Sequence, residues 1–238
     1  MSESKEEQIS LSDEYAEATD TNSSVPATNA PNELMQANLT NVIITGWARY
    51  KLIPIYKHTT TGEKDITNFK RSYFIKNYTA ENYISRHFMP GIDLLNGYNL
   101  INIAHYDMNT QKSILFFKNN VLVKNLYYPS FTQDSIDNKP VNRDYYLVSV
   151  YDSDTNKDTV INKKDLRTLY HFDLPATKST RLIPEGFSVV RSQYDRKSDV
   201  MYVFAREDKN RNGQIDNEEP ISIFGIDLKN PMPAFKVF

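Results

Sequence analysis

The chain has 238 residues, which allows one or two domains, and its net charge of −2 is far from the strongly basic range of nucleic-acid-binding domains. It contains no cysteine, which excludes disulfides, a thiolate nucleophile and cysteine-ligated zinc. No apolar run is long enough to span a membrane, and the sequence as it stands shows no signal peptide.

Residues 1–37 differ in composition from the rest of the chain. They hold eight acidic residues against Lys5 alone, a net charge of −7, so residues 38–238 carry +5. The segment is rich in Ser, Thr, Asn, Ala and Pro, and we expect a disordered acidic linker before a folded domain over residues 38–238. Two interpretations remain open: a solubilising leader, or the spacer of a lipoprotein whose signal and lipidated cysteine have been removed.

From residue 38 onward the pattern predicts a succession of short strands. β-Branched and aromatic residues cluster in short runs that turn residues separate, and residues 80–85 form the one helical candidate. The predicted strands cover residues 41–45, 48–56, 72–75, 98–105, 113–117, 121–126, 145–151, 169–172, 180–183, 187–193, 200–205, 221–226 and 234–238.

Two stretches match the twelve-residue calcium loop of the EF-hand, which places oxygen ligands at positions 1, 3, 5, 7, 9 and 12. The match is closest over residues 208–219, where Gly213 occupies position 6, at the sharp turn, and Ile215 occupies position 8. The alternative is a solvated hairpin turn, since Asp and Asn favour turns for local reasons. The predicted ligands are the side chains of Asp208, Asn210, Asn212, Asp216 and Glu219 and the backbone carbonyl of Gln214.

Residues 154–165 are an imperfect copy of this loop. Thr159 replaces the glycine in a conformation that only Gly adopts at little cost, and Asp165 at position 12 is one methylene shorter than Glu. A register that begins at Asp152 is rejected because it puts Lys163 at position 12. We therefore expect two calcium ions, with the Asp208 loop the stronger site. The predicted ligands of the first loop are the side chains of Asp154, Asn156, Asp158, Asn162 and Asp165 and the carbonyl of Val160, with Ile161 at position 8.

The flanks of both loops are typical of strands. Residues 145–151 and 169–172 surround the first loop, and residues 200–205 and 221–226 surround the second. All four segments are rich in β-branched and aromatic residues, whereas a true EF-hand has an amphipathic helix on each side. The sequence predicts strand–calcium loop–strand units.

The chain also repeats itself. Residues 105–117 resemble residues 171–183, residues 225–238 form a third version, and residues 55–66 are a fourth candidate. Asp154 and Asp208 are 54 residues apart, and so are Asp173 and Asp227. Four-stranded repeats of this length are typical of propeller blades, and residues 187–238 would form one complete blade.

These features resemble bacterial envelope proteins with TolB-like propeller blades. The resemblance rests on a tyrosine-rich strand, a DxNxD loop, a strand that ends in Phe-Asp-Leu, and the sequence from Thr177 to Gly186, and it covers roughly residues 98–238. It implies an all-β fold of propeller-like four-stranded blades with calcium-loop insertions, and it brings no catalytic residues. About 200 ordered residues make at most about four blades, so a four-bladed ring, a partial ring, a ring completed by a partner and an open sandwich remain alternatives.

Little in the sequence favours an enzyme. His105 and His171 occupy equivalent repeat positions, which favours a structural role, and the motifs GxSxG and HExxH are absent. The mixed basic and aromatic residues between 64 and 78 fit an ordinary solvated strand face, so no nucleic acid is expected.

We expect a calcium-binding module of the bacterial cell envelope that acts as a structural or protein-binding component. An envelope hydrolase or carbohydrate-active domain on the same scaffold is the alternative.

The expected compartment follows from calcium affinity. Extracellular calcium modules bind at about 10⁻⁴–10⁻³ M, and these loops lack the flanking helices that a cytosolic sensor moves. We therefore expect the periplasm or the cell surface, where the protein with its lipidated N-terminal cysteine would be anchored to the outer membrane. The expected partner is another envelope protein or a glycan, and the membrane is contacted only through an N-terminal lipid.

Overall fold

A computed structural model of the chain describes residues 7–11, 37–39, 41–57 and 89–238. In these residues the predicted all-β class is confirmed, and no helix there is long and apolar enough to cross a membrane. The predicted strand at 72–75 and the helical candidate at 80–85 lie outside the described residues. The strands are β1 (Gln8–Ser10), β2 (Ala37–Leu39), β3 (Ile43–Ile44), β4 (Tyr50–Lys57), β5 (Ile92–Asn96), β6 (Leu100–Asp107), β7 (Lys112–Leu115), β8 (Leu122–Pro129), β9 (Asp134–Ile136), β10 (Lys139–Val141), β11 (Tyr145–Tyr151), β12 (Val160–Asn162), β13 (Arg167–Asp173), β14 (Ser179–Arg181), β15 (Phe187–Asp195), β16 (Val200–Glu207), β17 (Ile221–Asp227) and β18 (Phe235–Lys236).

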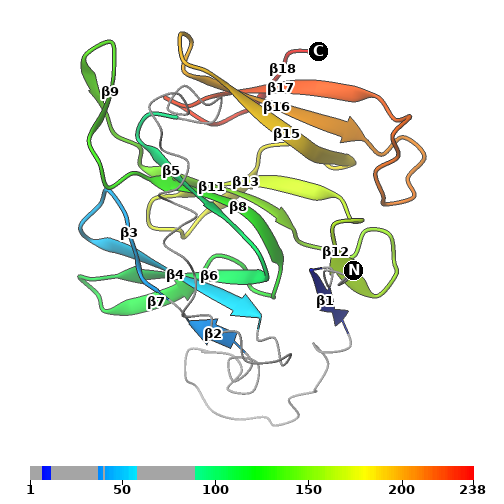
Figure 1. Cartoon of the computed structure of the whole chain (residues 1–238), viewed down its shortest axis with the longest axis horizontal. Helices are drawn as coiled ribbons and strands as arrows, with labels where there is room; N and C mark the ends of the chain where they lie inside the picture. The colour runs from blue at the N-terminus through cyan, green and yellow to red at the C-terminus, as the bar shows by residue number, and fades with distance from the viewer. Residues whose placement is uncertain (1–6, 12–36, 40, 58–88) are drawn as a thin grey trace, which may run out of the picture.

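Most of these strands belong to three antiparallel sheets. Sheet I contains β2, β4, β6 and β7 in that order, with β3 also paired to β4. Sheet II has the order β14-β13-β11-β8-β5, and sheet III has the order β15-β16-β17-β18. Figure 1 shows the sheets one above another, with sheet I at the bottom and sheet III at the top.

Sheet III is the four-stranded unit predicted for residues 187–238. Its strands follow one another in chain order as an antiparallel meander, the strand order of a propeller blade. The described residues form three stacked sheets and no closed ring, so the expectation of about four blades stays a prediction.

The internal repeat is visible in the hairpins of sheets I and II. His105 on β6 lies opposite Ile114, and His171 on β13 lies opposite Thr180, nine residues further along the chain in each case. The Asp that follows each His by two residues accepts backbone N–H groups of the turn through its side chain. The sequence similarity therefore reflects the same strand register, although the two turns are held by different hydrogen bonds.

Strand β11 lies at the centre of the molecule and is buried on both faces. Tyr146, Val148 and Val150 belong to the apolar core between sheets I and II, while Tyr145 and Leu147 belong to the core between sheets II and III. Because successive side chains of a strand point to opposite faces, a strand between two cores needs an unbroken apolar run. This explains why residues 145–148 read Tyr-Tyr-Leu-Val without polar alternation.

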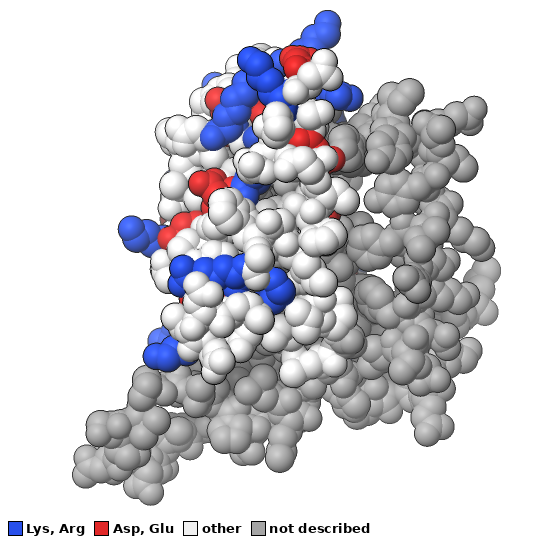
Figure 2. Space-filling model, turned by 90° about the vertical axis from the view of Figure 1, so that its left-hand side faces the viewer, with Lys and Arg blue, Asp and Glu red and all other residues white. Residues whose placement is uncertain are grey.

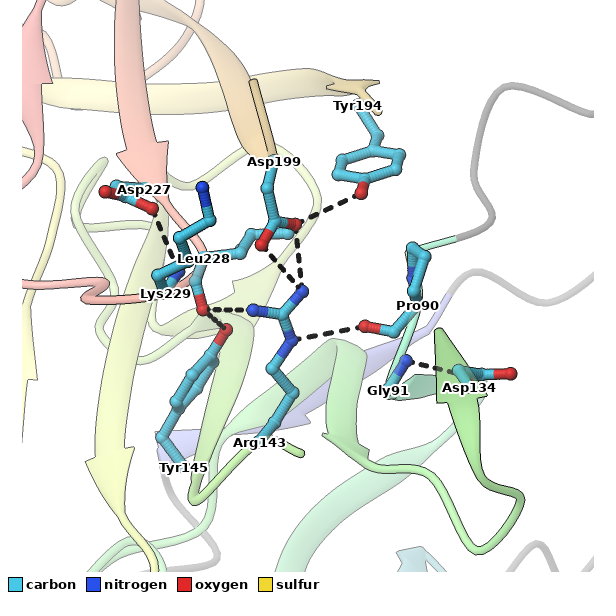
Figure 3. A network of polar contacts seen from close by, with 10 residues as sticks. All are labelled: Pro90, Gly91, Asp134, Arg143, Tyr145, Tyr194, Asp199, Asp227, Leu228 and Lys229. Carbon is cyan, nitrogen blue, oxygen red and sulfur yellow. Dashed lines mark hydrogen bonds and ion pairs between the residues drawn. The ribbon is translucent and has the colours of Figure 1, made fainter. Parts of the chain in front are cut away.

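A buried ion pair joins sheets II and III (Figure 3). Nη2 of Arg143, just before β11, lies 2.8 and 3.0 Å from the carboxylate oxygens of Asp199, just before β16. Nη1 donates to the carbonyl of Leu228 at 2.6 Å and Nε donates to that of Pro90 at 3.1 Å, while Tyr194 Oη donates to Asp199 at 3.1 Å. Such a pair contributes little net stability when intact, but the loss of either partner leaves an uncompensated buried charge and is strongly destabilising.

The N-terminal segment differs from expectation over residues 7–11. Strand β1 pairs with β12, and Ile9 is buried with Ile55, Ile101, Leu122 and Ile161. The prediction of a disordered linker here is wrong for these residues; it rested on the acidic and polar composition of the first 37 residues. Composition averages over a segment and misses one short apolar contact. The linker residues 12–36 lie outside the described residues.

Candidate calcium sites

The two predicted loops occupy equivalent positions in neighbouring sheets. Residues 154–165 lie between β11 and β13 of sheet II, and residues 208–219 join β16 to β17 of sheet III. Both loops project on the right-hand side of Figure 1. A strand on each side of each loop is confirmed, with no helix in either flank.

Each loop folds around the carboxylate at position 1. In the first loop Asp154 accepts the N–H groups of positions 5 and 6 at 3.0 and 2.8 Å. In the second loop Asp208 accepts the same two groups at 3.1 and 2.9 Å. The two sequences share few residues, so this agreement comes from the spacing of the polar side chains.

The side chains at positions 3 and 5 are held in the same way in both loops. The oxygen at position 3 accepts the N–H of position 5, at 3.0 Å in the first loop and 2.9 Å in the second. The oxygen at position 5 accepts the N–H of position 7, at 3.1 and 2.8 Å. In the second loop Asn210 and Asn212 both donate Nδ2 to Oδ2 of Asp216, at 2.8 and 3.0 Å, so positions 3, 5 and 9 converge on one point.

The carboxylate at position 12 closes each loop. Glu219 accepts the N–H of position 2 at 2.9 Å and that of position 9 at 3.1 Å. Asp165 accepts the equivalent groups at 2.8 Å each, although its side chain is one methylene shorter. The first loop therefore closes around the shorter acid. Asp165 is fully buried, and burial raises the pKa of its carboxyl group.

The backbone also agrees between the loops. At position 4, Lys157 and Arg211 have φ angles of +61° and +59°, and at position 6 Thr159 and Gly213 have φ angles of +70° and +74°. The left-handed conformation expected at Thr159 is confirmed. For a β-branched residue it carries a steric cost that Gly213 does not share.

The first loop receives support that the sequence did not reveal. Its positions 7–9 form β12, which pairs residue by residue with β1, and the N–H of Leu11 donates to the carbonyl of Thr159 at 3.0 Å. Ile161 at position 8 is buried beside Ile9, whereas Ile215 at the same position of the second loop is half-buried. The alternation of Gln8, Ile9, Ser10 and Leu11 was the available signal, but it is too short to stand out in a polar segment.

The oxygen donors of both loops suit calcium. Each loop offers three carboxylates, two Asn side chains and one backbone carbonyl, the hard oxygen ligands that calcium prefers. The described residues contain no cluster of three or more Asp, Glu, His or Cys side chains placed to hold a metal. The three carboxylates of each loop therefore do not lie close enough together to form such a cluster in this structure. The donor chemistry fits calcium better than it fits a transition metal.

Asp152 lies outside the first loop, in agreement with the rejected register. It accepts a hydrogen bond from Tyr170 Oη and lies 3.7 Å from Arg181 Nη2. These contacts fix the end of β11 to β13 and β14, so Asp152 has structural partners that are not part of the loop.

The two buried histidines belong to the cores. His105 Nε2 lies 3.0 Å from the carbonyl of Leu174, and its ring centroid is 4.8 Å from that of Tyr50. The ring of His171 lies 5.5 Å from that of Tyr145. Burial lowers the pKa of both imidazoles, which favours their neutral form. These surroundings support the structural role expected from the repeat.

Charged side chains are dispersed on the face of the molecule shown in Figure 2. Lys and Arg lie there in separate groups, with acidic and uncharged residues between them. No continuous basic stripe is visible among the described residues on this face.

Comparison of the chain with known protein families and with curated proteins finds no match. The two loops themselves therefore carry the functional conclusion.

Proposed function

We propose that this chain is a calcium-binding all-β module of the bacterial cell envelope, with a structural or protein-binding role. The observation that carries the proposal is the hydrogen-bond pattern that the two loops share. Positions 1, 3, 5 and 12 are oriented by the same backbone groups in two loops of different sequence. Two loops of different sequence thus hold four of the six predicted ligand positions in one arrangement.

The role of the ion follows from the charges in each loop. Asp154, Asp158 and Asp165 are gathered within one twelve-residue loop, and the second loop gathers three acids in the same manner. A bound calcium ion supplies positive charge and bridges oxygen ligands from both ends of the loop. Because the ion binds the folded loop, it stabilises the native state by about 2.7 kcal/mol at a concentration one hundredfold above the dissociation constant.

The Asp208 loop is the tighter site in this proposal. Gly213 adopts its φ angle without strain and Glu219 has the length for bidentate binding, whereas Thr159 is strained and Asp165 is short. Strand β1 raises the calcium affinity of the first loop in this proposal, because it holds positions 7–9 of that loop in place. It therefore narrows the difference in calcium affinity between the two loops.

The compartment and partners belong to the same proposal. Sites that stiffen connections between strands are useful where calcium is constant at about 10⁻⁴–10⁻³ M, as in the periplasm or at the cell surface. There the domain would bind another envelope protein or a glycan, and an N-terminal lipid would be its only membrane contact.

Thermal unfolding at increasing calcium concentration tests the proposal. Calcium at one hundredfold above the dissociation constant should raise the melting temperature by about 5–11 °C relative to a sample with chelator. Asp208→Ala should remove most of this increase. A melting temperature that calcium at about 10⁻³ M does not change would contradict the proposal.

Asp195→Ala is the matched control. Asp195 caps a surface turn through Lys197 N and Ser198 Oγ, outside both loops. Its replacement should lower the melting temperature equally with and without calcium and leave the calcium-dependent increase intact.

One observation favours the carbohydrate-active alternative. Trp47 and Phe131 are exposed by 39% and 70% at a cavity of about 200 Å³, which Gln133 and Asn142 also line. Trp47 Nε1 donates to the carbonyl of Arg143 at 2.6 Å, so the indole ring is held in one orientation. A fixed indole ring beside amide side chains is suited to an uncharged polar ligand. Titration with soluble glycans, comparing the native chain with Trp47→Ala, tests this alternative.

A further inference from the structure

The two loops touch each other directly. Thr155, at position 2 of the first loop, donates from Oγ1 to the carbonyl of Gly213, at position 6 of the second loop, over 2.6 Å. Gly213 is buried in this contact, and a Cβ added to it would overlap the backbone carbonyl of Thr155. Gly213 is thus required twice, once for its φ angle and once for the close approach of the loops.

Thr155 is also bound to the closing ligand of its own loop. Its N–H donates to Asp165 Oδ1 at 2.8 Å, and its Oγ1 lies 3.2 Å from the same oxygen. A hydroxyl group has one hydrogen to donate, so Asp165 and the carbonyl of Gly213 compete for it. The N–H of Leu166 donates to Oγ1 at 2.9 Å and keeps the hydroxyl oxygen in place between them.

The carbonyl of Gly213 belongs to a peptide unit that serves the second loop. The N–H of that unit, on Gln214, donates to Oδ1 of Asn212 at 2.8 Å, and Asn212 is the ligand at position 5. A firm hydrogen bond from Thr155 therefore orients the peptide whose other end holds a ligand of the second site. A continuous chain of contacts runs from Asp165 of one loop to Asn212 of the other.

We propose that the two loops bind calcium cooperatively, with Thr155 as the coupling residue; this inference rests on the proposed calcium function. A calcium ion bound to Asp165 attracts the negative charge of the carboxylate, so the carboxylate accepts the hydrogen bond from the Thr155 hydroxyl less strongly. The hydroxyl already lies nearer to the Gly213 carbonyl, at 2.6 Å, than to Asp165, at 3.2 Å. With the competition from Asp165 reduced it donates to Gly213 alone, which orders the second loop for its own ion. Coupling between sites is reciprocal, so an ion in the second loop favours binding in the first to the same degree.

Isothermal titration of the full chain with calcium alone tests the inference. In the native chain, the product of the two stepwise association constants should exceed the product of the single-site constants of Asp154→Ala and Asp208→Ala by about 5–150-fold, the usual range of coupling between sites. Thr155→Val, which keeps the branched shape and removes the hydroxyl, should reduce this excess towards one. Thr155→Ser, which keeps the hydroxyl, should restore it.

Thr177→Val is the control for loss of a threonine hydroxyl. Thr177 Oγ1 donates to Asp173 in the β13–β14 turn, outside both loops, so its replacement should leave the excess unchanged. Two independent ions, with the same constants in the native chain and in Thr155→Val, would overturn the inference and leave the calcium proposal standing. A native chain that binds no calcium would instead overturn the proposed function.

Discussion

Gly213→Ala should destabilise the protein more than its change of one methyl group suggests. An L-residue in the left-handed region costs about 1–2 kcal/mol. The new Cβ overlaps the backbone of Thr155, so the loops must separate and lose the hydrogen bond from Thr155 Oγ1, which contributes about 1 kcal/mol. The sum is about 2–3 kcal/mol, or a fall of about 4–12 °C in melting temperature for a chain of this length.

Gly186→Ala separates the two contributions. Gly186 has a φ angle of +78°, close to that of Gly213, but a Cβ added there meets no atom within 4 Å. Its replacement should therefore cost only the backbone strain. Both variants would be measured by thermal and urea unfolding in chelator, so that calcium plays no part. Equal losses in the two variants would refute the claim that Gly213 is needed for contact between the loops.

Three further predictions concern other parts of the fold. Thr159→Gly should stabilise the chain by up to about 1 kcal/mol in urea unfolding, because relief of backbone strain outweighs the backbone entropy that Gly loses. A loss of stability would show that the Thr159 side chain makes a needed contact. Ile9→Ala should lower stability by about 2 kcal/mol, since Ile9 is buried against the first loop, and unchanged melting would show that residues 7–11 do not pack. Burial lowers the pKa of His105 in the folded chain. The contribution of the neutral imidazole to stability is therefore fully present above about pH 6.5, the ordinary pKa of histidine in an unfolded chain. It is lost as the pH falls from there through the lower folded pKa. His105→Gln should flatten this acid-side decline in melting temperature, and an unchanged pH profile would contradict the reasoning.

The conformation of the two twelve-residue loops was the most predictable feature of the candidate sites. Their signal is the identity of residues at fixed spacing, and spacing of polar side chains alone determines which backbone N–H groups they can reach. The prediction at Thr159 followed from the same reasoning, because position 6 of this loop requires a positive φ angle whatever residue occupies it. The strands beside the loops were predictable because Tyr145–Tyr151 and Ile221–Asp227 are rich in β-branched and aromatic residues.

Contacts between distant segments could not be predicted from the sequence. The docking of Ile9 beside Ile161 joins residues more than 150 positions apart, and nothing in either segment identifies the other. The contact between Thr155 and Gly213 is of the same kind, since it depends on how sheets II and III are stacked. Nothing in the sequence connects Arg143 with Asp199, and only the packing of the sheets makes them a buried pair.

A segment that contacts the first loop also emerged only from the structure. The sequence offered no helix for an ion to displace, which argued for a purely static site. Strand β1 pairs with the part of the first loop that supplies the position 7 carbonyl, so the order of residues 7–11 and the shape of the loop depend on each other.

The central claim is that each loop holds one calcium ion, and equilibrium dialysis counts those ions directly. At a free calcium concentration of about 10⁻³ M, the native chain should bind two ions, Asp154→Ala and Asp208→Ala should each bind one, and the double variant should bind none. A native chain that binds no calcium, or a double variant that still binds two ions, would contradict the account.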